Sequence, residues 1–318
     1  MRVNKNSTKF DVIIIGGGAA GLSAALWCDE LGLSALLLEA GAEFGGQLLR
    51  TYNEIRNHLG TKAANGRELR DRFLEQTEKR RFEFRLNAKV AEIDLKKKSV
   101  GLENGEVFFA GALIIASGVS RRKLNVEGEE TFENRGVIES GKRDARLAEG
   151  RSALVVGGGD AAFENALILS ETASLVTLLY RGKHFRARRE FVEKAEKHPK
   201  IKILTETIVR EISGREKVEA VKLENLQTGE IYDYPVEAVL IRIGVEPNTK
   251  FLSGKLDLDV NGYIKISQTC ETSAVGVFAV GDVANPLAPT VSSAVGMGAT
   301  AVKTITNYEL KEIIFFNS

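Results

Sequence analysis

The sequence has few cysteines, and no two of them are close enough in the chain to act as a pair. Its 318 residues include only Cys28 and Cys270, which form neither a C-x-x-C motif nor a metal-ligand spacing. We therefore expect no disulfide framework, no bound metal and a reducing, cytoplasmic compartment. Each thiol is expected to be a small buried side chain rather than a redox group.

Further absences exclude other classes of protein. No apolar run approaches the ~18–20 residues that cross a bilayer, and no apolar segment precedes the first strand-like run. Neither a membrane span nor a secretory signal is therefore expected. The formal net charge of +1 gives no overall field that would attract nucleic acid. With 43% hydrophobic and 27% charged residues, the chain has the composition of a globular protein, and its length allows two domains.

Glycine is abundant, with 31 residues, and it clusters. The run DVIIIGGGAAGLSAAL, from Asp11, predicts a strand, a glycine turn and a helix, in which Gly16, Gly18 and Gly21 fit G-x-G-x-x-G. In this motif the glycines allow a tight turn, the approach of a pyrophosphate and close helix packing. The next strand-like run ends at Glu39, where a carboxylate would bind ribose hydroxyls.

The motif occurs twice. SALVVGGGDAAFENAL, from Ser152, aligns on the first run without a gap, so that Gly157 and Gly159 fall on the first two motif glycines. Ala162 replaces the third, and Tyr180 stands where the first copy has its acid. We interpret the pair as two dinucleotide-binding units. The alternative is that both are only tight turns of a doubly wound fold.

The second copy is followed by the basic segment YRGKHFRARRE. An arginine in the ribose position pairs with a 2′-phosphate, whereas a carboxylate there would repel it. The segment therefore favours NADP over NAD. The alternative is a solvated basic helix start, above all for Arg188 and Arg189.

Motifs in an ordered set carry a resemblance to a known family. GGQL at 45–48, Asn57 in EIRNHLG, LIIASG up to Gly118, and VFAVGD with Gly281 and Asp282 accompany the two glycine turns. Together they resemble the low-molecular-weight thioredoxin reductases over essentially the whole chain.

The resemblance implies an α/β fold of two Rossmann-like domains. The FAD-binding domain is expected to be discontinuous, at 1–119 and 248–318, with the NAD(P)H-binding domain inserted at 120–247. The links SRRKL and IGVEPN are the expected hinge strands. From their apolar character we expect residues 313–316 to pack into the FAD-binding domain, the alternative being that they cover the flavin or form a dimer contact. The family also implies a homodimer.

The resemblance and the two motifs assign two cofactor sites. For FAD they name Gly16, Gly18, Ala19, Ala20, Gly21, Glu39, Gly46, Gln47, Leu48, Asn57, Ala116, Ser117, Gly118, Gly281 and Asp282. For NADPH they name Gly157, Gly159, Asp160, Ala161, Arg181, Lys183 and Arg186.

One family feature is missing from the segment RGVIESGKRDARLAEG, residues 135–150. In the reductases this segment carries C-x-x-C followed by Asp. Here the cysteine positions fall on Ser140 and Arg143, and the acid falls on Asp144. A thiolate must attack and a second thiol must resolve for disulfide reduction by that route. Ala20 likewise replaces the cysteine of the bacillithiol-disulfide-reductase branch.

We therefore expect an FAD-dependent NAD(P)H oxidoreductase with a non-disulfide acceptor, either an electron-transfer protein such as ferredoxin or flavodoxin or a small molecule. Thioredoxin-reductase-type ferredoxin–NADP reductases also lack C-x-x-C. His58 and Asp144 are the candidate catalytic side chains. Two alternatives stay open. One is a flavoprotein reduced by another donor, with a degenerate nicotinamide site signalled by Gly182, where the family has arginine. The other is a non-enzymatic flavin- or nucleotide-sensing protein.

Overall fold

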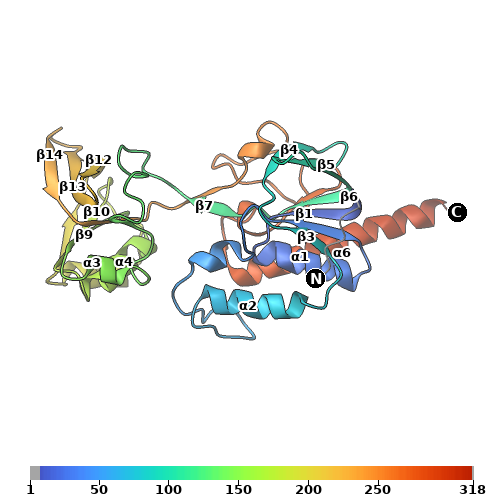
Figure 1. Cartoon of the computed structure of the whole chain (residues 1–318), viewed down its shortest axis with the longest axis horizontal. Coiled ribbons are helices and arrows are strands. Elements are labelled where there is room, and N and C mark those ends of the chain that lie inside the picture. The colour runs from blue at the N-terminus through green and yellow to red at the C-terminus, as the bar shows by residue number, and fades with distance from the viewer. Residues whose placement is uncertain (1–7, 317–318) are drawn as a thin grey trace. The chain divides into compact units, whose positions relative to one another are not determined.

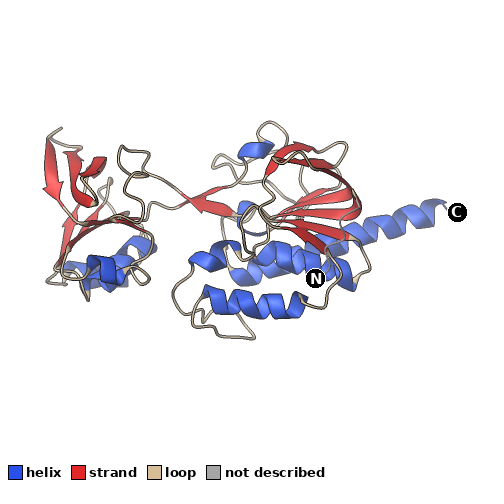
Figure 2. Cartoon of the chain, viewed as in Figure 1, coloured by secondary structure: helices blue, strands red, loops and turns tan. Residues whose placement is uncertain are grey.

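A computed structural model describes residues 8–316, with side chains described as far as residue 307. The predicted packing of residues 313–316 depends on side chains that are not described, and residues 1–7 and 317–318 of the predicted FAD-binding domain lie outside the described residues. By its internal contacts the chain divides into unit 1, residues 1–120 and 246–318, and unit 2, residues 121–245. Figure 1 labels many of the elements of both units, and Figure 2 distinguishes helices from strands.

Unit 1 is built on a seven-stranded sheet in the order β3-β2-β1-β6-β5-β4, with β17 also pairing with β6. The pairs β3–β2, β2–β1, β1–β6 and β6–β17 are parallel, whereas β4 and β5 are antiparallel additions. The strands are β1 (Lys9–Ile15), β2 (Ala35–Leu38), β3 (Glu83–Arg85), β4 (Val90–Asp94), β5 (Ser99–Leu102), β6 (Val107–Ile115) and β17 (Val277–Ala279).

The helices of unit 1 pack on one face of this sheet, as Figure 1 shows. They are α1 (Ala19–Glu30), α2 (Gly66–Thr77) and α6 (Val291–Phe316), with short 3₁₀ turns η1 (Gly46–Arg50), η2 (Lys250–Leu252) and η3 (Gly281–Val283). Strand β1 is buried on both sides: Val12 and Ile14 join the cluster under α1 and α6, while Ile13 and Ile15 join a second cluster on the opposite face. This explains why the run reads as continuously apolar.

Unit 2 contains a five-stranded parallel sheet in the order β11-β10-β9-β15-β8 and a three-stranded antiparallel sheet β12-β13-β14. Helices cover one face of the parallel sheet, and the smaller sheet covers the other. The strands are β8 (Val137–Ile138), β9 (Ser152–Val156), β10 (Leu175–Leu179), β11 (Ile201–Leu204), β12 (Thr207–Gly214), β13 (Val218–Asn225), β14 (Ile231–Pro235) and β15 (Ala238–Ile241). The helices are α3 (Ala145–Ala148), α4 (Asp160–Ser170) and α5 (Arg189–Glu196).

The chain passes between the units through two segments that pair with each other, β7 (Val119–Arg121) and β16 (Val245–Pro247). They fall within or beside the two links expected to be hinge strands. Both Rossmann-like sheets are present, so the α/β fold class predicted from the sequence is confirmed.

Candidate functional site: a dinucleotide cleft and a second glycine turn

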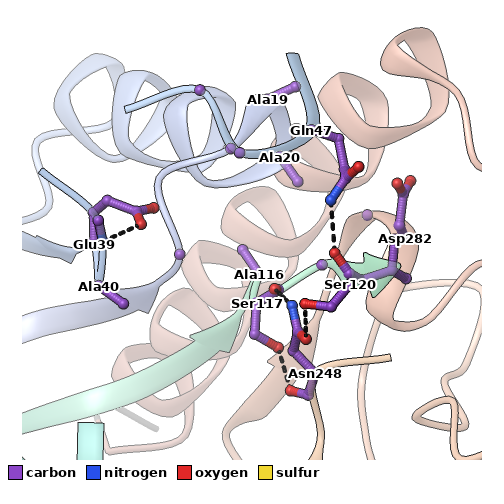
Figure 3. A pocket seen from close by; sticks show the side chains of 18 of the residues that line it. Ala19, Ala20, Glu39, Ala40, Gln47, Ala116, Ser117, Ser120, Asn248 and Asp282 are labelled. Atoms are coloured by element: carbon purple, nitrogen blue, oxygen red, sulfur yellow. Dashed lines mark hydrogen bonds between the residues drawn. The ribbon is translucent and has the colours of Figure 1, made fainter. Parts of the chain in front are cut away.

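A cleft of about 1050 Å³ opens at the carboxyl ends of the parallel strands of unit 1. This is the edge of an open α/β sheet at which ligands bind. Figure 3 shows some of the side chains that line it. Of the residues predicted to hold FAD, all line the cleft except Gly21 and Asn57.

The three motif glycines of the first turn have different structural roles. Gly16 has φ +112°, and a Cβ there would lie 2.3 Å from the carbonyl oxygen of Ala116. Gly21 lies inside the unit, where a Cβ would lie 1.8 Å from the carbonyl oxygen of Gly16. Gly18 caps α1 and faces only Gly46, whose Cα would be 4.0 Å from an added Cβ. Gly18 and Gly46 thus leave a passage without side chains beside the unsatisfied N–H groups at the start of α1, and this passage suits a pyrophosphate.

Glu39 stands where the ribose acid was expected. Its Oε2 accepts a hydrogen bond from the Gly17 N–H at 2.7 Å, and its Oε1 accepts one from the Gly41 N–H at 2.7 Å. These bonds fix the carboxylate beside the glycine turn. Each carboxylate oxygen keeps a further lone pair for a ribose hydroxyl.

At another part of the cleft, Asp282 follows β17 in η3 and lines the cleft. Within the described part of the chain its carboxylate accepts no hydrogen bond, and burial raises its pKa. A half-buried carboxylate without a protein partner fits a ligand that brings hydroxyl donors. The cleft volume, the bare glycine passage and this carboxylate therefore fit FAD, with Glu39 and Asp282 as acceptors for its sugar-derived hydroxyls.

The wall of the cleft is held together by Asn248, a residue that the sequence reasoning missed. Its Nδ2 donates to the carbonyl oxygen of Ser117 at 2.7 Å, its Oδ1 accepts from the Ser120 hydroxyl at 2.7 Å, and the Ser117 hydroxyl donates to its carbonyl oxygen at 2.9 Å. Gln47 Nε2 donates to the carbonyl oxygen of Val119 at 2.7 Å nearby (Figure 3). The only sequence signal for Asn248 was its place at the end of the predicted link IGVEPN.

Two predicted residues are not brought into the cleft. Asn57 is exposed and does not line it. His58, the candidate catalytic histidine, also lies outside the lining; its Nδ1 is 2.9 Å from the Ser292 hydroxyl, and its ring packs edge-on against Phe73. These contacts suit a histidine that joins two surface segments. Its catalytic role stays a prediction.

The second glycine turn, in unit 2, repeats the geometry of the first. Gly157 has φ +152°, and a Cβ there would lie 2.1 Å from the carbonyl oxygen of Arg242. Gly159 caps α4 and has open space around it. Asp160, which begins α4, accepts hydrogen bonds from the Arg188 N–H at 2.7 Å and from its Nε at 2.8 Å. The turn and the start of α4, with Ala161 in its first turn, therefore fit a second pyrophosphate.

The predicted cations of this site are exposed. Arg181, Lys183 and Arg186 form no ion pair with the described residues, and the Arg186 N–H donates to the carbonyl oxygen of Gly158 at 2.8 Å. That bond holds the basic segment against the glycine turn. By contrast, Arg188 and Arg189 bind acids of the same unit. The first three cations therefore fit an anionic ligand beside the turn better than the last two.

The segment that would carry the dithiol in the reductases is a closed network of hydrogen bonds. Asp144 Oδ2 accepts from the N–H groups of residues 139 and 140, Ser140 Oγ accepts from those of residues 142 and 143, and the Asp144 N–H donates to the Ser140 carbonyl oxygen. Asn165 Oδ1, on α4, accepts from the Gly141 N–H at 2.9 Å. Every backbone N–H from residue 139 to residue 144 is satisfied.

Ion pairs reinforce the same hydrogen-bond network. The Arg143 guanidinium donates to both oxygens of Asp144, with Nε 2.5 Å from Oδ1, and it also pairs with Glu139. Burial alone would raise the pKa of Asp144, but the hydrogen bonds from Arg143 and from the backbone outweigh burial and hold the pKa below its ordinary value. Asp144 is therefore an ionised partner of Arg143 at neutral pH, and its candidate catalytic role stays a prediction.

The two cysteines are buried, as expected. Cys28 lies in α1 and Cys270 in a loop, and neither forms a disulfide. Burial raises the pKa of Cys28 to about 12 and that of Cys270 to about 11. Neither thiol is a ready nucleophile at neutral pH.

No helix in the described residues is long and apolar enough to span a membrane. The family described as pyridine nucleotide-disulphide oxidoreductase matches residues 10–298. A thioredoxin reductase of Mycolicibacterium smegmatis is 36% identical, over 94% of this chain and 96% of that protein. A "34.2 kDa protein in rubredoxin operon" of Clostridium pasteurianum is 30% identical, over 96% of this chain and 98% of that protein.

Among solved structures, the thioredoxin reductase of Lactococcus lactis superposes with a TM-score of 0.83 at 32% identity, covering 95% of this chain and 99% of that one. The family match covers most of this chain and includes both glycine turns. The chain therefore belongs to the pyridine nucleotide-disulphide oxidoreductase family, as a thioredoxin-reductase-like, FAD-dependent oxidoreductase that uses a nicotinamide cofactor.

Proposed function

We propose that this protein takes a hydride from NADPH into FAD and passes the two electrons to an acceptor that is not a disulfide. The acceptor is a small electron-transfer protein, such as ferredoxin or flavodoxin, or a small molecule. When bound, FAD supplies a centre that receives two electrons together and can release them one at a time.

The observation that carries the proposal is the closed segment 139–144. The positions that need two thiols hold Ser140 and Arg143, and both are committed to hydrogen bonds with their own loop. A serine hydroxyl has no reversible oxidised partner, and an arginine cannot attack a disulfide. The buried Cys28 and Cys270 have raised pKa values and cannot substitute. The relative from a rubredoxin operon supports an electron-transfer protein as the kind of acceptor.

The residues of this chain would have the following roles in binding the two cofactors. Glu39 and Asp282 accept hydrogen bonds from FAD hydroxyls, and the starts of α1 and α4 face the two pyrophosphates. Arg181, Lys183 and Arg186 favour the 2′-phosphate of NADPH over the free hydroxyl of NADH. The homodimer that the resemblance implies stays a prediction.

The test is an anaerobic titration of the FAD-loaded protein, followed by the flavin absorbance. NADPH should bleach the flavin faster than NADH does, and NADPH should then sustain turnover with ferricyanide, ferredoxin or flavodoxin. Oxidised thioredoxin and small disulfides should give no turnover above the protein-free rate. A flavin that stays oxidised under NADPH would instead support another donor. Bleaching without turnover by any acceptor would support a sensor.

The matched control removes both sulfurs by C28A and C270A. Its turnover with ferricyanide should equal that of the wild type, because neither thiol lies on the electron path. Thioredoxin turnover that the wild type shows and this variant loses would overturn the proposal.

A further inference from the structure

Tyr180 lies between two glycines at the carboxyl end of β10. A Cβ on Gly158 would lie 2.4 Å from Cδ2 and Cε2 of its ring. A Cβ on Gly182 would lie 2.8 Å from Cε1, 2.9 Å from Cζ and 3.0 Å from the hydroxyl oxygen. Both glycines therefore lie against the ring, Gly158 at its Cδ2–Cε2 side and Gly182 at its Cε1 side near the hydroxyl. Phe185 packs beside the ring at 5.6 Å between ring centroids, so neighbours on several sides hold its position.

In the first unit Glu39 occupies the corresponding place. A Cβ on Gly17, the middle glycine of that turn, would lie 3.1 Å from Glu39 Oε2, which already accepts the Gly17 N–H. A carboxylate at this place accepts hydrogen bonds from ribose hydroxyls. Tyr180 offers a neutral hydroxyl, which can donate, and in the described part of the chain this hydroxyl has no hydrogen-bond partner.

The surroundings of the ring are cationic. Arg181 and Lys183 flank Gly182 in the chain, and both are exposed and free of ion pairs within the described residues. Arg186 is tied to the same turn through its backbone N–H. A free donor hydroxyl beside unpaired cations at the end of the second strand matches the chemistry of a phosphate on the adenosine ribose.

We propose that Tyr180 and Gly182 together set the nucleotide specificity of unit 2. The Tyr180 hydroxyl donates a hydrogen bond to the 2′-phosphate, while Arg181 and Lys183 supply the charge. Gly182 leaves the space that this ring position needs. On this view position 182 lacks an arginine because any side chain there would collide with the Tyr180 ring, and the nicotinamide-nucleotide site is retained. This inference deepens the proposed use of NADPH and rests on it.

The test compares two fragments, 2′,5′-ADP and 5′-AMP, which differ only in the 2′-phosphate. Binding to the FAD-loaded protein is measured by calorimetry, so that no catalytic readout is involved. Y180F should weaken 2′,5′-ADP about tenfold, the effect of one lost hydrogen bond to a charged group, and should change 5′-AMP by less than about twofold. Y232F, in the same unit but on the small sheet, is the matched control and should change neither.

Gly182 is tested by its coupling to the ring. G182A should weaken 2′,5′-ADP about as much as Y180F does, because the added methyl would lie within 3.0 Å of Cε1, Cζ and the hydroxyl oxygen and so would displace the ring. In a Y180A background, G182A should have no further effect, because there is no ring to displace. Equal effects of G182A in both backgrounds would overturn the steric part of the proposal. Circular dichroism and FAD content confirm that each variant is folded.

The outcomes separate this inference from the proposed function. If the wild type binds 5′-AMP as tightly as 2′,5′-ADP, the proposed use of NADPH fails. If the wild type prefers 2′,5′-ADP and both Y180F and G182A keep that preference, NADPH use stands and the role of Tyr180 and Gly182 is refuted.

Discussion

Exchanging single glycines of the first turn for alanine should separate a packing role from a ligand role. In G21A the added methyl would lie 1.8 Å from the carbonyl oxygen of Gly16 and 3.0 Å from its carbonyl carbon. Both are backbone atoms, so no side chain can rotate away. In G18A the methyl would meet only the Cα of Gly46, at 4.0 Å, and Gly18 already has φ −76°, which alanine adopts freely.

The magnitudes follow from these distances. An ordinary contact needs about 3.5 Å, so α1 would have to move from β1 by roughly 1.5 Å in G21A. Such overpacking costs about 3 kcal/mol, which lowers the melting temperature of a unit of this size by roughly 6–12 °C. For G18A we expect a change in the free energy of unfolding of no more than about 0.5 kcal/mol, because no clash is made. Its methyl does fill the passage opposite Gly46, so FAD should bind at least about tenfold more weakly.

The assay is chemical unfolding of the FAD-free protein, together with an FAD titration of each variant. G21A should be unstable whether or not FAD is present, whereas G18A should be stable but pale in colour. If G21A unfolds at the wild-type denaturant concentration, or if G18A binds FAD as tightly as the wild type, Gly21 and Gly18 do not divide packing and ligand binding between them.

Two other predictions concern the replaced segment and the cysteines. D144N should lower the free energy of unfolding by about 2–3 kcal/mol at pH 7, because buried partners lose a charged acceptor, while D233N on the exposed face of β14 changes little. The pKa of Asp144 is lower in the folded protein than in the unfolded chain, where it is about 3.9. The contribution of Asp144 to the free energy of unfolding is therefore complete above this unfolded pKa and is lost as the pH falls through the folded pKa. Unfolding measured from pH 7 to pH 3 should show the free energies of wild type and D144N converging towards acid. Cys28 and Cys270, with pKa values raised to about 12 and 11, should resist iodoacetamide at pH 8 in the folded protein and react after unfolding, and rapid labelling of the native protein would contradict their burial.

The sequence predicts the fold well because the fold depends on local patterns. Each glycine turn has its strand before it and its helix after it within one short run, and both runs fold as β-turn-α in the structure. The cleft residues that follow strands, such as Glu39, Ser117 and Asp282, meet because parallel strands end at the same edge. Order along the chain was therefore enough to bring them together.

The residues that the sequence missed depend on distant contacts. Asn248 holds Ser117 and Ser120 across more than a hundred residues of chain, and no local pattern marks it. Asn57 and His58 lie outside the cleft lining, in an irregular segment whose course depends on contacts such as that between His58 and Ser292, and their roles stay predictions. The packing of Tyr180 between two glycines is likewise visible only in three dimensions.

The two glycine turns have the same strand–turn–helix backbone and differ in a few residues. Where the first copy needs Gly21, the second tolerates Ala162, whose methyl lies 3.0 Å from an imagined Cβ on Gly157, a glycine by necessity. Where the first copy has an acid, the second has a tyrosine. The duplicated scaffold thus repeats one turn, and in the proposed function these few side chains decide which dinucleotide each unit binds.

The segment 139–144 extends the same reasoning from binding to chemistry. Ser140 and Asp144 accept hydrogen bonds from its backbone N–H groups, and Arg143 neutralises the acid. Gly141 leaves space for Asn165, whose Oδ1 would lie 2.9 Å from a Cβ there. These residues fit one another, so restoring two cysteines alone would leave Asp144 buried without its guanidinium. Segment 139–144 is therefore internally consistent without thiols, which is what the proposed non-disulfide acceptor requires.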